Sequence, residues 1–110
     1  MARQKLVVLT NATPDQDEAF REWYIGRHLD DVVRFPGFVS AQLYEAVPRA
    51  IDPEPEYRYY AEYEMESDDP AADVRALYSR FETPDLPGTP ALAEQRYSGL
   101  YVAISAVVKR

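Results

Sequence analysis

The chain has 110 residues, of which 46% are hydrophobic and 28% charged, and this is typical of one globular domain. Its formal net charge of −7 argues against nucleic-acid binding, because phosphate contacts need clustered lysine and arginine. The absence of cysteine excludes disulfides and thiolate chemistry, and no apolar run approaches the roughly 20 residues of a membrane span. We therefore expect a single domain over residues 1–110, located in the cytoplasm and without membrane contact.

The first half of the chain predicts a strand, a long helix and a second strand. Residues 5–10 are apolar and β-branched, as buried strands are. Thr13-Pro14 is typical of a helix start and Pro36-Gly37 of a helix end, which predicts a helix over about 14–34. The second strand is predicted over 38–47, followed by a proline-rich loop over 48–56.

The second half of the chain again predicts a strand, a helix and a strand. Residues 57–65 alternate between apolar and polar side chains, which predicts a strand with one buried face. Ser67, Asp68 or Asp69 should cap a helix over about 70–81, followed by a loop over 83–90, a short helical turn over 91–95 and a last strand over 99–108. The order β-α-β-β-α-β predicts an α+β, ferredoxin-like fold: a four-stranded antiparallel sheet with two helices on one face.

The uncovered face of this sheet predicts an assembly. Residues 38–47 and 99–108 carry apolar side chains on both faces of their strands. A chain of this size should not leave an apolar sheet face in water. The simplest solution is a homodimer that packs sheet against sheet.

The first predicted helix carries the main functional candidates. At about 100° per residue, one side of this helix is apolar except for the only histidine of the chain: Phe20, Tyr24, His28, Val32 and Phe35. Histidine is the side chain that ordinarily titrates near neutral pH. With Tyr24 and Asp31 (or Asp30) within one helical turn, His28 could be a general acid/base oriented by a carboxylate, with an ionisation between about pH 5 and 8. The alternative is a core histidine that bonds a backbone carbonyl.

Aromatic side chains are the candidates for ligand binding. Trp23 lies beside the helix stripe. Five tyrosines come from different strands, and some of them could converge on one ligand: Tyr44, Tyr57, Tyr59, Tyr63 and Tyr101. A phenol can donate a hydrogen bond to an enolate or phenolate oxygen. The alternative for each tyrosine is simple packing. A metal site is not expected, since there is one histidine and no cysteine and a Glu62, Glu64, Glu66 series is typical of a solvated strand face. No nucleotide-cofactor motif is present, so no cofactor is expected.

The pattern resembles a known superfamily. The segment Trp23-Tyr24-xxx-His28-Leu29, the Pro36-Gly37-Phe38 turn and the aromatic strand with AEYE followed by DDP are similar to dimeric α+β barrel proteins, most of all the EthD-like branch with its polyketide-cyclase-like relatives. The resemblance implies a homodimer with a cavity between sheet and helices in each subunit, and it maps the recurrent helix-borne histidine to His28. Haem-degrading relatives carry a ligand histidine on the second helix, and residues 69–81 have none.

Three functions follow as hypotheses. The first is a cofactor-independent enzyme, of cyclase, isomerase or lyase type, that acts on an aromatic or polyketide-like substrate with His28 as acid/base. The second is a non-catalytic dimeric module that binds a ligand or assists a partner enzyme. The third is a cofactor-free monooxygenase. Fold alone does not choose among them.

Overall fold

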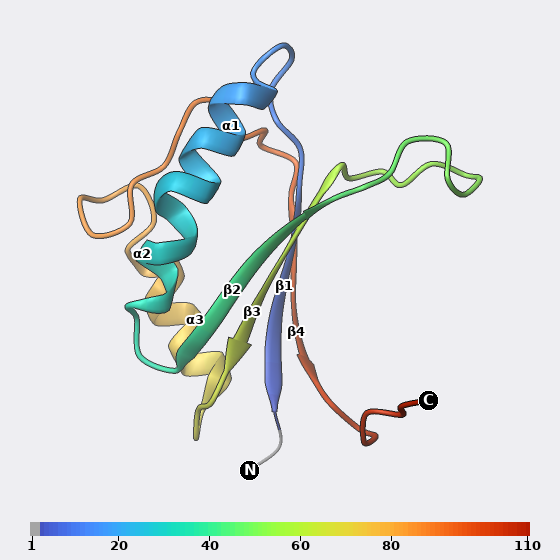
Figure 1. Ribbon diagram of the computed structural model, residues 1–110. Helices are drawn as coiled ribbons and strands as arrows, with labels where there is room; N and C mark the ends of the chain where they lie inside the picture. Colours follow the sequence, from blue (N-terminus) through green and yellow to red (C-terminus); the bar gives the residue numbers. More distant parts are fainter. Residues whose placement is uncertain (1–2) are drawn as a thin grey trace.

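The structure, a computed structural model, describes residues 3–110 (Figure 1). Its elements in chain order are β1 (Gln4–Thr10), α1 (Asp17–Trp23), η1 (Tyr24–His28), α2 (Leu29–Val33), β2 (Phe38–Glu45), β3 (Tyr59–Met65), α3 (Pro70–Ser79) and β4 (Tyr97–Val102). Since α1, η1 and α2 follow one another without a break, they form one long helix. The predicted order β-α-β-β-α-β is confirmed.

The four strands form one sheet with the order β2-β3-β1-β4, and all neighbours are antiparallel. Figure 1 shows the long first helix and α3 on the same face of this sheet. The predicted α+β, ferredoxin-like fold is therefore confirmed. No helix within residues 3–110 is long and apolar enough to cross a membrane.

The core lies between the helices and the sheet face that they cover. Burial alternates along β3, so one face of this strand is buried and the other is not, as the sequence pattern predicted. Phe20 of α1 stacks on Tyr59 of β3 with ring centroids 4.4 Å apart, which fixes the start of the helix against the sheet. The largest buried side chains are Leu6, Phe20, Tyr24, Val32, Tyr59, Tyr63, Met65, Leu77 and Leu86.

The start of α3 is as predicted. The carboxylate of Asp69 accepts a hydrogen bond from the backbone N–H of Ala72 at 3.2 Å, which satisfies one of the free donors at the helix start. Pro70 occupies the first helical position, where its missing N–H costs nothing.

The start of the first helix differs from the prediction. The helix begins at Asp17 and not at Pro14, because Asp15 has a left-handed backbone (φ 63°) and residues 13–16 form a turn. Thr13 is not a helix cap. Its hydroxyl donates to the carbonyl of Pro90 at 3.3 Å, so it joins this turn to the loop after α3.

A tight turn at Gly37 connects the first helix to β2. Gly37 has φ +90°, a conformation that side-chain-bearing residues rarely adopt. A Cβ atom here would also collide with the carboxylate of Asp73, which accepts a hydrogen bond from the hydroxyl of Ser67. The predicted helix end at Pro36-Gly37 is thus set by both backbone and packing.

The uncovered sheet face is less apolar than the sequence predicted. A bulge between Phe38 and Ser40 turns Phe38 into the core and places Ser40, Gln42 and Tyr44 outward. Lys5 and Glu62 form an ion pair there, with Nζ and Oε2 2.9 Å apart. Tyrosines are the main apolar side chains of this face: Tyr44, Tyr60, Tyr97 and Tyr101. The prediction of a wholly apolar face is therefore wrong.

The last strand is shorter than predicted and shifted toward the N-terminus. β4 ends at Val102, which is paired with Gln4, the first residue of β1, so β1 offers little more chain to pair with. Residues 103–110 have no regular structure and leave the sheet (Figure 1), with Ile104 96% exposed. Residues 91–95 form no helical turn either, since Leu92 makes an isolated bridge with Ala12.

Candidate functional site

A π-helical turn in the first helix organises the site. In η1 the turn is one residue wider than in an α-helix, and the N–H of Leu29 donates to the carbonyl of Tyr24, five residues earlier. Residues five apart in an α-helix point about 140° away from each other. Here the rings of Trp23 and His28 stack with centroids 4.3 Å apart and planes at 21°. The π-turn therefore brings both rings to the same side of the helix.

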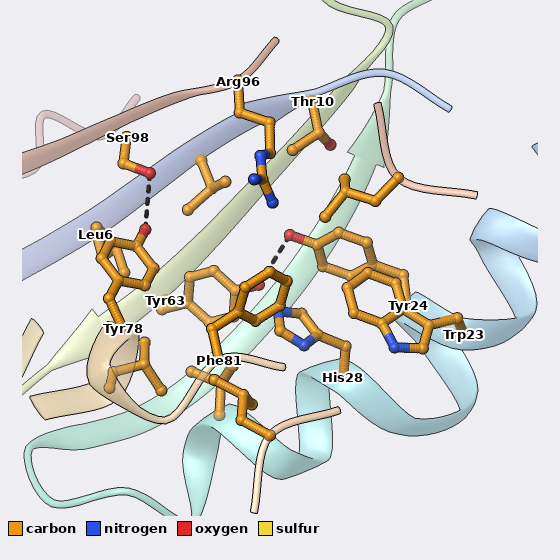
Figure 2. A pocket seen from close by; sticks show the side chains of 15 residues that line it. Leu6, Thr10, Trp23, Tyr24, His28, Tyr63, Tyr78, Phe81, Arg96 and Ser98 are labelled. Atoms are coloured by element: carbon orange, nitrogen blue, oxygen red, sulfur yellow. Dashed lines mark hydrogen bonds between the residues drawn. The ribbon is translucent and has the colours of Figure 1, made fainter. Parts of the chain in front are cut away.

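These rings line a cavity between the helices and the covered face of the sheet (Figure 2). Its volume is about 280 Å³, close to the lower bound of roughly 300 Å³ for small-molecule sites. Leucine, valine and phenylalanine side chains form much of the lining. The chemically active side chains that face it include Thr10, Trp23, Tyr24, His28, Tyr63 and Arg96.

His28 is buried and uncharged at neutral pH. Its side chain lies against Trp23, makes an edge contact with Tyr24 at 4.9 Å between ring centroids, and has Phe81 6.1 Å away. Burial lowers the pKa of His28 to about 4, and the negative charge of Asp31 opposes this only in part. The ionisation expected between pH 5 and 8 is therefore displaced to more acidic pH in the free protein.

Asp31 does not orient the imidazole. Its carboxylate accepts a hydrogen bond from Nε of Arg27 at 3.1 Å and lies 3.5 Å from Arg34, and no hydrogen bond joins it to His28. The Nδ1 atom of His28 is buried and has no hydrogen-bond partner among the described residues. Asp31 therefore acts on His28 only through its negative charge and not through the predicted hydrogen bond. The alternative prediction, a hydrogen bond between the imidazole and a backbone carbonyl, is not seen at Nδ1 either.

Tyr24 and Tyr63 form a buried pair of phenols. The hydroxyl of Tyr63 donates to the hydroxyl of Tyr24 at 2.9 Å, which leaves the proton of Tyr24 available for another acceptor. Burial raises the pKa of both groups, so both stay protonated at neutral pH. The pair thus offers a hydrogen-bond donor next to the imidazole.

Of the other predicted ligand-binding residues, Trp23 and Tyr63 line this cavity, and the remaining tyrosines lie apart from it. Tyr44 and Tyr101 are on the uncovered sheet face, where Tyr44 donates to Gln42 and the hydroxyls of Tyr101 and Tyr97 are 2.6 Å apart. Tyr59 is in the core, and its hydroxyl donates to Asp17. A ligand bound in the cavity at His28 would therefore not contact Tyr44, Tyr59 or Tyr101.

Thr10 and Arg96 were not predicted from the sequence as residues of this site, whereas Tyr63 was one of the five candidate tyrosines. The alternation of β1 and β3 assigns Thr10 and Tyr63 to the covered face, so this signal could have found Thr10 and singled out Tyr63 among the tyrosines. Arg96 follows a loop that has no periodic pattern, so nothing in the sequence indicated its direction. Within residues 3–110 no group of three or more acidic or histidine side chains is arranged to hold a metal ion.

Comparison with known proteins places the fold. No family model matches the sequence, and no curated protein matches it. A candidate monooxygenase from Shewanella loihica has a similar structure, with a TM-score of 0.59 and 19% identity, over 96% of this chain and 99% of that chain. The haem-degrading protein MhuD of Mycobacterium tuberculosis, solved with two haems in its active site, gives 0.60 and 17% over the same shares of the two chains.

A third similar structure comes from the DABB family. This ferredoxin-like protein of Mesorhizobium loti has a TM-score of 0.56 and 12% identity, over 96% of this chain and all of that chain. At such identities the similarities establish the fold and not the chemistry. The protein thus has a ferredoxin-like fold, as the sequence pattern predicted, and shares it with these three proteins.

Proposed function

We propose that the protein is a small-molecule enzyme that works without a bound cofactor and uses His28 to take a proton from an aromatic substrate. The observation that carries the proposal is the Nδ1 atom of His28, which is buried in an apolar cavity without a hydrogen-bond partner. A buried polar atom without a partner costs free energy. An acidic O–H or C–H group of a bound substrate would supply that partner and could pass its proton to the neutral ring.

Removal of a proton begins each reaction that the sequence suggested. The resulting anion can attack an electrophilic carbon of its own molecule, as in a cyclase, move a double bond, as in an isomerase, or expel a leaving group, as in a lyase. It can also react with dioxygen, as in a cofactor-free monooxygenase. This second candidate is favoured by the fold similarity to the candidate monooxygenase of Shewanella loihica. The free proton of Tyr24 supports either course, because it can stabilise an oxygen anion.

Haem, which MhuD binds, does not fit this cavity. An apolar cavity of about 150 Å³ holds one benzene ring. The cavity of about 280 Å³ therefore has room for two fused rings and not for a tetrapyrrole. No step of the proposed reaction passes through haem.

Further predictions from the sequence belong to this proposal. The homodimer is supported by the four tyrosines of the uncovered sheet face, since tyrosine is enriched in protein interfaces. Membership of the EthD-like branch rests on the motif around His28, and the single domain over 1–110 and the cytoplasmic location rest on composition. The non-catalytic binding module remains the alternative if no turnover is found.

Deuterium exchange tests the proton transfer directly. The ketone 2-tetralone has two fused rings and an acidic C–H at carbon 1, and its exchange in D₂O is followed by NMR without knowledge of the later steps. We expect the protein to accelerate this exchange and His28→Asn to lower the acceleration by roughly 10²–10⁴-fold. Oxygen uptake, measured on the same samples, separates the monooxygenase from the other reactions.

Asp31→Asn is the matched control, because Asp31 lies one turn from His28 without a hydrogen bond to it. This variant should change the exchange rate far less than His28→Asn. Melting temperatures of all samples show that the proteins are folded. Full exchange activity in a folded His28→Asn protein would reject the proton-transfer role and leave the binding module as the better reading.

A further inference from the structure

Arg96 brings a positive charge to the cavity from the side opposite the helix. It directly precedes β4, and Figure 2 shows its guanidinium group pointing into the cavity toward the phenol oxygen of Tyr24. The guanidinium carbon lies 5.5 Å from the ring centroid of Phe81, so the side chain rests on an aromatic face. This packing holds the charged end over the cavity.

No carboxylate within residues 3–110 lies at ion-pair distance from Arg96. Its electrostatic neighbours are phenols: the charge of Arg96 acts to lower the pKa of Tyr24 and of Tyr78, against the larger opposite effect of burial. The hydroxyl of Tyr78 is itself paired with that of Ser98 at 2.7 Å. Arg96 is exposed to solvent, so the cavity has at its rim a cation that no anion of the described chain neutralises, in a chain with a net charge of −7.

A second polar group without a partner lies next to Arg96. In the sheet, Leu9 is paired with Tyr97, so the following position of β1, Thr10, stands opposite Arg96. Thr10 is 1% exposed, and its Oγ1 atom has no hydrogen-bond partner among the described residues. A hydroxyl and a guanidinium together are suited to an oxygen anion, since both can donate hydrogen bonds to it.

We propose that the natural substrate is an aromatic carboxylate whose carboxylate group binds to Arg96 and Thr10, with its rings in the apolar cavity beside His28. This inference concerns the cavity of the proposed function, but it does not depend on catalysis by His28. The two ends of the cavity then have different tasks. Arg96 orients the anionic end, and the reactive part of the ring system is held against the imidazole and Tyr24.

Two probes of equal shape test the charge requirement. 2-Naphthoate carries the carboxylate, and 2-naphthamide presents an uncharged group on the same two rings, a size that the cavity volume admits. Isothermal titration calorimetry should show that 2-naphthoate binds about tenfold more tightly, as one charge-assisted hydrogen-bonded contact provides. Arg96→Gln should abolish this preference while the affinity for the amide stays close to that of the wild-type protein, and Arg96→Lys should retain part of it.

Arg75→Gln is the control for net charge, because Arg75 is an exposed residue of α3 outside the cavity. It should keep the full preference for the carboxylate. Equal affinities of the two probes for the wild-type protein, no binding of either probe at millimolar concentration, or an unchanged preference in Arg96→Gln would each overturn the inference. The deuterium-exchange assay tests the proton transfer, and calorimetry tests the carboxylate site. The two measurements therefore distinguish an enzyme without a carboxylate preference from a carboxylate-binding protein without activity.

Discussion

The buried imidazole of His28 should make the protein less stable in mild acid. The pKa of His28 is lowered to about 4 in the folded protein, chiefly by burial, against an ordinary value of 6.5 in the unfolded chain. Between these two values the unfolded chain binds a proton that the folded protein does not bind. The free energy of unfolding therefore falls as the pH decreases from 6.5 toward 4.

The size of this effect follows from the difference in pKa. Each pH unit inside the window is worth about 1.4 kcal/mol, so the full window corresponds to about 3 kcal/mol. At pH 5, which is still above the pI of about 4.6, the loss should already be about 2 kcal/mol. Measurements between pH 7.5 and 5 thus capture most of the effect and avoid the pH of lowest net charge.

The assay is urea unfolding of the wild-type protein and of His28→Asn, followed by circular dichroism at fixed protein concentration. The two proteins can differ in free energy of unfolding at pH 7.5. Between pH 7.5 and 5, the wild-type protein should lose about 2 kcal/mol more of this free energy than the variant. Other titrating groups cancel in this difference. His28→Phe serves as a second variant if the amide disrupts packing. Parallel curves for wild-type and variant over this range would refute the buried, neutral state of His28.

Two other predictions concern packing and assembly. Trp23→Ala should destabilise the protein by about 3 kcal/mol in chemical unfolding, because the partly buried ring packs against the core and its Nε1 donates to the carbonyl of Pro87 at 3.1 Å. A loss below about 1 kcal/mol would contradict this packing. Sedimentation at micromolar concentration should give a dimer of the 12.6 kDa chain, and Tyr101→Glu on the uncovered sheet face should shift it toward monomer. A stable monomer for the wild-type protein would contradict the sheet-to-sheet dimer.

The sequence predicted the fold well because its signals are local. The alternation of residues 57–65, the Asp69 cap and the Pro36-Gly37 turn each depend on short-range chemistry, and the structure contains all three. The position of His28 on the buried side of the helix was also predictable from the helical spacing of the apolar residues around it. These features needed no knowledge of which strands become neighbours.

The rest depends on irregular geometry that periodicity cannot reveal. Counting at 100° per residue cannot anticipate the π-turn that stacks Trp23 on His28. Strict alternation cannot anticipate the bulge in β2 that places Phe38 on the opposite face from Ser40. Asp31 is one helical turn from both His28 and Arg27, and its carboxylate accepts a hydrogen bond from Arg27. Arg96 enters the cavity from a loop, and its direction is decided by packing on Phe81.

The π-turn η1 holds one residue more than an ordinary helical turn, and α1 and α2 on either side of it still bury Phe20 and Val32 against the sheet. Removal of Gly26, which has no atoms within 4 Å of its would-be Cβ, would convert the turn to an ordinary α-helix in which Trp23 and His28 are four residues, or about 40°, apart. Trp23 and the imidazole would then still face the same side, so the π-turn sets how many residues separate the two rings in the sequence and not the side on which they lie. A chain with an uninterrupted helix would therefore carry the counterpart of His28 four residues after that of Trp23, and its alignment with this chain would need a gap of one residue inside the helix.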